Sequence, residues 1–99
     1  MIELEETNQQ VKVKISGDIF VEQATVLREK LIPFTQKKGM RFLLDLTSVS
    51  YIDSSGLGVL VAIQKRALQN GGGVQIKGLQ GHVKELFELT RLTKVFEMV

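Results

Sequence analysis

One aspartate, two serines and two glycines lie close together in the segment DSSGLG, residues 53–58. A carboxylate or hydroxyl at the start of a helix accepts hydrogen bonds from N–H groups that lack a partner in the helix, and the same N–H groups can bind a phosphate. The segment follows one apolar run and precedes another that has helical spacing. Its residues therefore suggest either helix capping or a site of phosphate chemistry.

Catalysis by these serines has little support from the surrounding residues. A nucleophile elbow needs glycines two positions before and two after the serine; Ser54 has only Gly56, and Ser55 has neither. The only histidine, His82, follows a glycine at the start of a short predicted helix, where we interpret it as an exposed or capping residue. A hydrolase using either serine with His82 would need these groups within about 3 Å of each other.

Metal and nucleotide sites are not indicated either. The chain has no cysteine, and its His, Asp and Glu residues show no metal-ligand spacing. The glycines at 56, 58 and 71–73 match neither the Walker pattern nor the dinucleotide fingerprint. We therefore expect no metal and no cofactor, and the residues give weak support for a catalytic role.

Recognition by another protein is the alternative to catalysis. We expect Ser54 in a loop just before the helix, with its hydroxyl exposed. Gly56 and Gly58 each cost roughly 1 kcal/mol relative to Ala within a helix, so they require either close packing or room for a partner. A phosphoryl group on Ser54 would add about −1.5 to −2 charges beside Asp53 and oppose docking there. From the residues alone, a cap with tight packing and a phosphorylation switch are both open.

Length and composition exclude several classes. The 99 residues predict a single domain over 1–99. The net charge is only +2, the basic residues are scattered, and five of the six aromatics are Phe in apolar settings, which does not indicate a nucleic-acid surface. No apolar run approaches the roughly 20 residues of a membrane helix, and the acidic N-terminus is unlike a signal peptide. We expect a cytoplasmic protein without nucleic-acid or membrane contacts.

The elements that position the segment predict an α/β domain. Alternating apolar and charged residues over 2–6 and 11–15 predict a hairpin whose Glu and Lys side chains face one another. Helical spacing predicts a helix over 21–37, with Pro33 bending or shortening its last turn. The apolar run 41–46 predicts a central strand covered on both faces. A helix over 57–68, a strand over 74–76, a helix over 82–89 and an extended segment over 95–99 follow.

The segment VSYIDSSGLGVL, residues 49–60, resembles the signature of STAS domains of the bacterial anti-sigma factor antagonist family. The resemblance covers essentially the whole chain, with similar stretches at 17–19, 26–33, 69–72 and 85–92. It implies a mixed central β-sheet with helices packed mainly on one face. Relatives commonly continue into a final amphipathic helix, which we expect to be absent or truncated in these 99 residues.

The resemblance implies a non-enzymatic regulator. Unphosphorylated, such proteins bind an anti-sigma factor that is itself an ATP-dependent serine kinase, and so free a sigma factor. The kinase phosphorylates the serine directly after the aspartate, here Ser54, and a metal-dependent serine phosphatase resets the switch. The implied contact surface comprises Asp18, Phe20, Val21, Asp53, Ser55, Gly56 and Leu57.

Phe20 departs from the family pattern, which often has a second acid at this position. An exposed Phe would change the docking surface and therefore the choice of partner. Since a fold does not fix a function, a second hypothesis keeps the STAS fold but makes the chain a constitutive interaction or scaffold module in a signalling or transporter complex.

Overall fold

The computed structural model describes all 99 residues and contains a five-stranded mixed sheet. Its strands lie in the order β1-β2-β3-β4-β5; β1 is antiparallel to β2, and the other neighbours are parallel. The order of elements predicted from the sequence is confirmed. The elements are β1 (Ile2–Thr7), β2 (Gln10–Ser16), α1 (Val21–Thr35), β3 (Arg41–Ser48), α2 (Ser54–Gln69), β4 (Gly73–Lys77), α3 (Gly81–Leu89), a 3-10 turn η1 (Leu92–Lys94) and β5 (Glu97–Met98).

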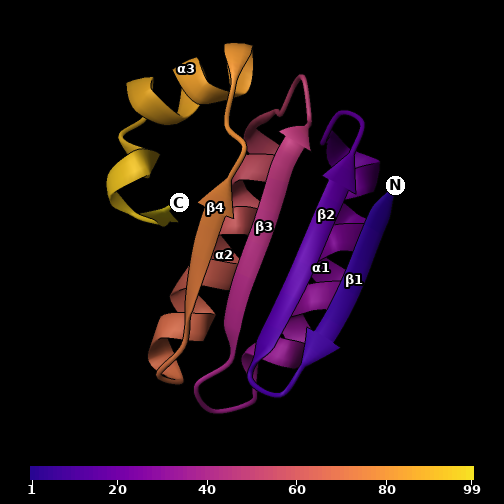
Figure 1. Cartoon of the computed structure of the whole chain (residues 1–99). Helices are drawn as coiled ribbons and strands as arrows, with labels where there is room; N and C mark the ends of the chain where they lie inside the picture. The colour runs from indigo at the N-terminus through magenta and orange to yellow at the C-terminus, as the bar shows by residue number, and fades with distance from the viewer.

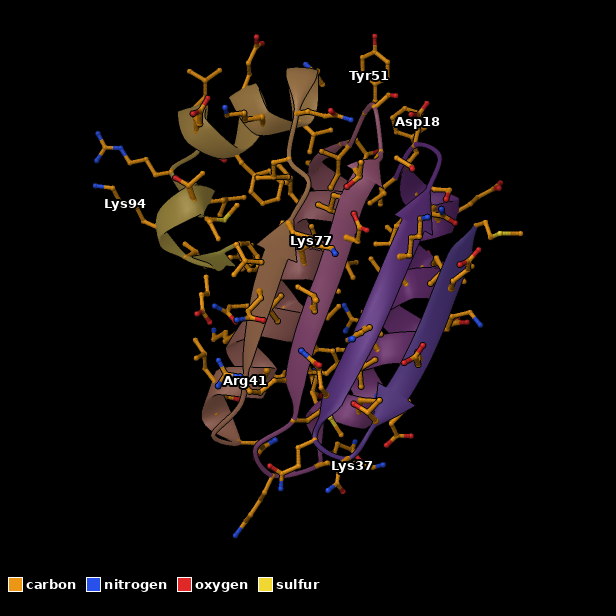
Figure 2. The ribbon with its side chains drawn as sticks, viewed as in Figure 1. Asp18, Lys37, Arg41, Tyr51, Lys77 and Lys94 are labelled. Atoms are coloured by element: carbon orange, nitrogen blue, oxygen red, sulfur yellow. The ribbon has the colours of Figure 1, made fainter.

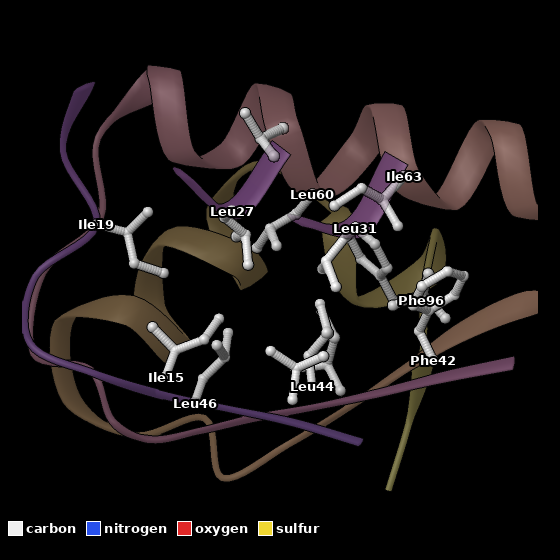
Figure 3. Close-up of a cluster of buried hydrophobic side chains, with 14 of the residues drawn as sticks. Ile15, Ile19, Leu27, Leu31, Phe42, Leu44, Leu46, Leu60, Ile63 and Phe96 are labelled. Atoms are coloured by element: carbon white, nitrogen blue, oxygen red, sulfur yellow. The ribbon is translucent and has the colours of Figure 1, made fainter. Parts of the chain in front are cut away.

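Helices α1 and α2 lie together on one face of the sheet, and α3 lies beyond the end of β4 (Figure 1). This arrangement confirms the expected packing of helices mainly on one face. The core between the helices and the sheet contains 22 buried apolar residues, and Figure 3 shows part of this cluster. Every second residue of β2, β3 and β4 points into it, because side chains alternate between the two faces of a strand. Those of the neighbouring parallel strands β2 and β3 are Val11, Val13, Ile15, Phe42, Leu44 and Leu46.

The opposite face of the sheet has no helix over it (Figure 1). Strand β3 is central, as predicted, but the prediction that it is covered on both faces is wrong. Its burial alternates, with Arg41 exposed and both Leu43 and Asp45 only half-buried. Leu43 lies on the open face, and its apolar side chain made residues 41–46 look continuously buried.

Charges of alternating sign cross this open face in one row. Glu3 lies opposite Lys14, Lys14 opposite Asp45, and Asp45 opposite Lys77. The pKa of Asp45 is lowered mainly by a hydrogen bond of 2.6 Å that the Thr47 hydroxyl donates to its carboxylate. Burial raises the pKa, whereas the hydrogen bond from the Thr47 N–H and the positive charge of Lys77 lower it further. The row keeps an uncovered sheet face polar, and the β1–β2 hairpin confirms that Glu and Lys side chains face one another.

Two elements, helix α1 and strand β5, are shorter than predicted. Helix α1 ends at Thr35, two residues before the predicted end at residue 37, and Pro33, which has no N–H to donate, lies in its last turn. The chain leaves the helix through bonds from Gln36 N–H to Pro33 O and from Lys37 N–H to Phe34 O. Within the expected extended segment 95–99, only residues 97–98 form a strand. None of the helices combines the length and apolarity that a membrane crossing needs.

Candidate functional site

The segment 53–58 forms the last loop residue after β3 and the first turn of α2. Asp53 is the N-cap: its Oδ1 accepts the Gly56 N–H at 3.0 Å, and its carbonyl accepts the Leu57 N–H at 3.0 Å. This cap starts the helix at Ser54, three residues before the predicted position, and contributes about 1 kcal/mol. The prediction that Ser54 lies in a loop is therefore wrong. As the first residue of α2, Ser54 is nevertheless exposed, as expected.

The loop between β2 and α1 is fixed to this helix start. Ile19 forms an isolated parallel bridge with Ile52, and both side chains are buried. The Ile19 N–H donates to Tyr51 O at 3.0 Å, and the Asp53 N–H donates to Ile19 O at 3.2 Å. Figure 2 shows Asp18 and Tyr51 at the same end of the molecule. The two segments predicted to share one surface are thus held side by side.

The two glycines of the first turns serve different purposes. Gly56 is buried, and a Cβ built on it would lie 2.6 Å from Ile52 Cγ1 and 2.8 Å from Ile19 Cγ2. Gly58 is exposed, and a Cβ there would meet no atom within 4 Å. Close packing therefore explains Gly56, while Gly58 leaves open space over the helix. The expectation that Gly56 lines an exposed surface is wrong, because it packs beneath that surface and holds it in place.

The remaining predicted residues differ in exposure. Ser55 and Leu57 are half-buried, and Leu57 packs against the core. Neither serine hydroxyl of the segment forms a side-chain hydrogen bond. Phe20 is 49% exposed and Val21 61% exposed, which are high values for apolar side chains. Phe20 is also the N-cap of α1, where its side chain makes no capping bond.

Tyr51, which the sequence analysis did not single out, also belongs to this end of the molecule. It is 52% exposed, and its ring centroid lies 5.2 Å from that of His82. His82 is exposed, as expected, but Gln80 is the N-cap of α3, and no hydrogen bond joins His82 to Ser54. An aromatic residue two positions before Asp53 was the available signal for Tyr51. No group of three or more His, Asp or Glu side chains gathers as a metal site would require.

Comparison with known proteins covers nearly the whole chain. The family model described as "Mlab, STAS domain" matches residues 2–99. An anti-sigma-B factor antagonist of Bacillus subtilis is 34% identical over 98% of this chain and 88% of its own length. A protein of the same name from Staphylococcus aureus is 36% identical over 82% of this chain and 75% of its own. The structure of the anti-sigma factor antagonist SpoIIAA in its unphosphorylated form is similar, with a TM-score of 0.87, 17% identity and coverage of 100% and 88% of the two chains.

Proposed function

Because the chain belongs to the STAS-domain family of anti-sigma factor antagonists, we propose that it binds a kinase-type anti-sigma factor while Ser54 is unphosphorylated. Binding frees a sigma factor, and transfer of the ATP γ-phosphoryl group to Ser54 ends it. A metal-dependent serine phosphatase restores the hydroxyl. The chain itself is not an enzyme, and it acts in the cytoplasm without binding nucleic acid or membrane.

The observation that carries this proposal is the position of Ser54. It is exposed at the first residue of α2, directly after the capping Asp53, and its hydroxyl has no bond to break before phosphorylation. At this position a phosphoryl group lies at the positive end of the helix dipole, so it does not oppose the helix. Attachment there need not unfold the domain, which a reversible switch requires.

Local charge supports dissociation as the result of phosphorylation. The added charge of about −1.5 to −2 would stand beside the Asp53 carboxylate, with Asp18 in the adjoining loop. The ion pairs of the chain join Glu6 to Lys37, Arg41 to Glu97 and Asp45 to Lys77, so none of them involves these two acids. Both carboxylates are therefore unpaired and add to the negative charge that a partner meets there. Such a charge repels an acidic or apolar docking surface.

The proposed contact surface combines the β2–α1 loop with the start of α2. Asp18, Phe20 and Val21 contribute exposed side chains from the loop. Asp53, Ser55 and Leu57 contribute from the helix start, and Gly56 positions them from below.

Phosphorylation is tested by incubating the chain with the purified anti-sigma factor kinase of its source organism and MgATP. Intact-mass spectrometry should show one added phosphoryl group on the wild type and none on Ser54→Ala. Ser55→Ala is the matched control, since it removes the neighbouring hydroxyl and should keep full labelling. Labelling that persists in Ser54→Ala would end the assignment of Ser54 as the acceptor.

Binding is tested with a charge mimic. Ser54→Asp should weaken affinity for the same kinase about tenfold or more, because it places permanent negative charge beside Asp53. Ser54→Asn introduces a side chain of nearly the same shape as Asp but without its charge, so its affinity for the kinase should stay close to that of wild type. If Ser54→Asp bound as tightly as wild type, the constitutive interaction module would be the better assignment.

A further inference from the structure

A shallow hollow of about 630 Å³ lies between the β2–α1 loop and the first turns of α1. Phe20, Val21 and Val26 line it with apolar side chains that are 49%, 61% and 40% exposed. The packed face of α1 is formed by other residues, so these three do not serve the core. Three exposed apolar side chains that share one hollow are available to a binding partner.

The charge around this hollow is negative. Asp18 and Glu22 line it, and no lysine or arginine does, although the chain as a whole carries +2. The one cation present, the Met1 amino group, donates to the Ser16 carbonyl at 2.7 Å and is therefore already engaged. An apolar floor with acidic neighbours complements an apolar group that is flanked by basic residues.

Phe20 is also a poor choice for the local structure. As the N-cap of α1 it has extended backbone angles, which would let Ser, Thr, Asp or Asn accept a bond from the first helical turn. A Phe side chain offers no such acceptor and leaves half of its ring in water. Residues that break a local rule without a structural gain are expected at functional sites.

We propose that this hollow docks an apolar side chain of the anti-sigma factor, presented by a segment with flanking lysine or arginine, and that Phe20 is its anchor. The inference rests on the proposed function, which it deepens by specifying the chemistry of the partner. The bonds that join Ile19 to Tyr51 and Asp53 place the hollow and Ser54 on one rigid unit. A partner anchored at Phe20 is therefore held beside Ser54. Its basic residues face Asp18 and Glu22 at the hollow, and the part of it that meets the start of α2 is the acidic or apolar surface that a phosphate on Ser54 repels.

The decisive variant is Phe20→Ser. It supplies the missing cap of α1, so thermal melting followed by circular dichroism should show a higher Tm than wild type. Affinity for the anti-sigma factor kinase, measured by calorimetry, should nevertheless fall about tenfold or more, because anchor aromatics dominate such interfaces. A loss of affinity with a gain of stability cannot be attributed to unfolding.

Two further variants test the apolar floor and the charge. Val26→Lys should weaken binding similarly, whereas Leu89→Lys, at a residue 82% exposed on α3, should leave affinity unchanged. Glu22→Gln should weaken binding at low salt and lose that effect at high salt, because screening removes the contribution of an exposed charge.

The outcomes distinguish failure of the hollow as a docking site from failure of the proposed function. Wild-type affinity in Phe20→Ser or Val26→Lys, or an equal loss in Leu89→Lys, would overturn the hollow as the docking site while leaving phosphorylation at Ser54 intact. A wild-type chain that neither binds the kinase nor accepts phosphate from it would overturn both.

Discussion

The contrast between Gly56 and Gly58 makes a paired prediction, because the same substitution should have opposite effects two residues apart in one helix. In Gly56→Ala the new methyl group would lie 2.6 Å from Ile52 Cγ1, 2.8 Å from Ile19 Cγ2 and 3.0 Å from Ile19 O. The two Cγ atoms are one bond from Cβ in buried side chains, and the oxygen belongs to the backbone, so none of the three can move aside without a shift of the surrounding structure. In Gly58→Ala the methyl group enters open space.

The expected magnitudes follow from two opposing effects. Overpacking a buried position costs about 1–3 kcal/mol, and the contacts at Gly56 favour the upper half of that range. Replacing Gly by Ala inside a helix returns roughly 1 kcal/mol at either position. Gly56→Ala should therefore lower the free energy of unfolding by about 1–2 kcal/mol, and Gly58→Ala should raise it by up to about 1 kcal/mol. For a domain of this size, 1 kcal/mol corresponds to about 4–8 °C in Tm.

Urea unfolding followed by circular dichroism measures both variants against wild type. The m-value serves as the control, since an unchanged m-value shows that the native and unfolded states expose the same surface. Two results would refute the packing argument. One is a Gly56→Ala variant as stable as wild type, and the other is a Gly58→Ala variant that loses as much stability as Gly56→Ala.

Two further predictions concern buried and titrating groups. The buried amide of Gln64 donates to Val95 O at 2.6 Å and accepts the Val74 N–H at 2.8 Å. Gln64→Leu leaves these two backbone groups unpaired, so urea unfolding should show a free energy of unfolding about 2–4 kcal/mol lower than wild type. A loss below about 0.5 kcal/mol would contradict this expectation. The Asp45 carboxylate, bonded by Thr47, has a folded-state pKa below its ordinary value of 3.8, so its contribution is present above that pH and is lost as the pH falls through the folded-state pKa. Asp45→Asn should therefore have a lower free energy of unfolding than wild type at pH 7, and this difference should shrink in acid. A difference that grew on acidification would contradict a lowered pKa of Asp45.

Much of the fold could be predicted from local patterns. The alternation over residues 2–6 and 11–15 predicted the hairpin and its charge pairs, because period-two burial depends only on the strand itself. The helical spacing predicted α1 to within two residues at its end, with Pro33 in the last turn. The helix that starts at Ser54 was predicted three residues late, since apolar spacing begins only at Leu57 and the first turn is held by a polar cap.

The surface around the site depended on contacts between distant segments. Strand β3 looked covered on both faces because Leu43 is apolar, yet no element packs on that side. Phe20 was recognised as a departure from the family pattern, but its association with Val26 in one hollow required the placement of α1.

The sequence by itself determined that Asp53, Ser54 and the glycines stand at a strand–helix junction, and that their spacing suits neither a nucleophile elbow nor a metal site. It could not divide the roles of the two glycines, since a glycine's local preference is the same whether its missing side chain makes room for the core or for a partner. Only the tertiary structure decided this. It brings Ile19, more than thirty residues earlier in the sequence, against Gly56, and it leaves the space over Gly58 empty.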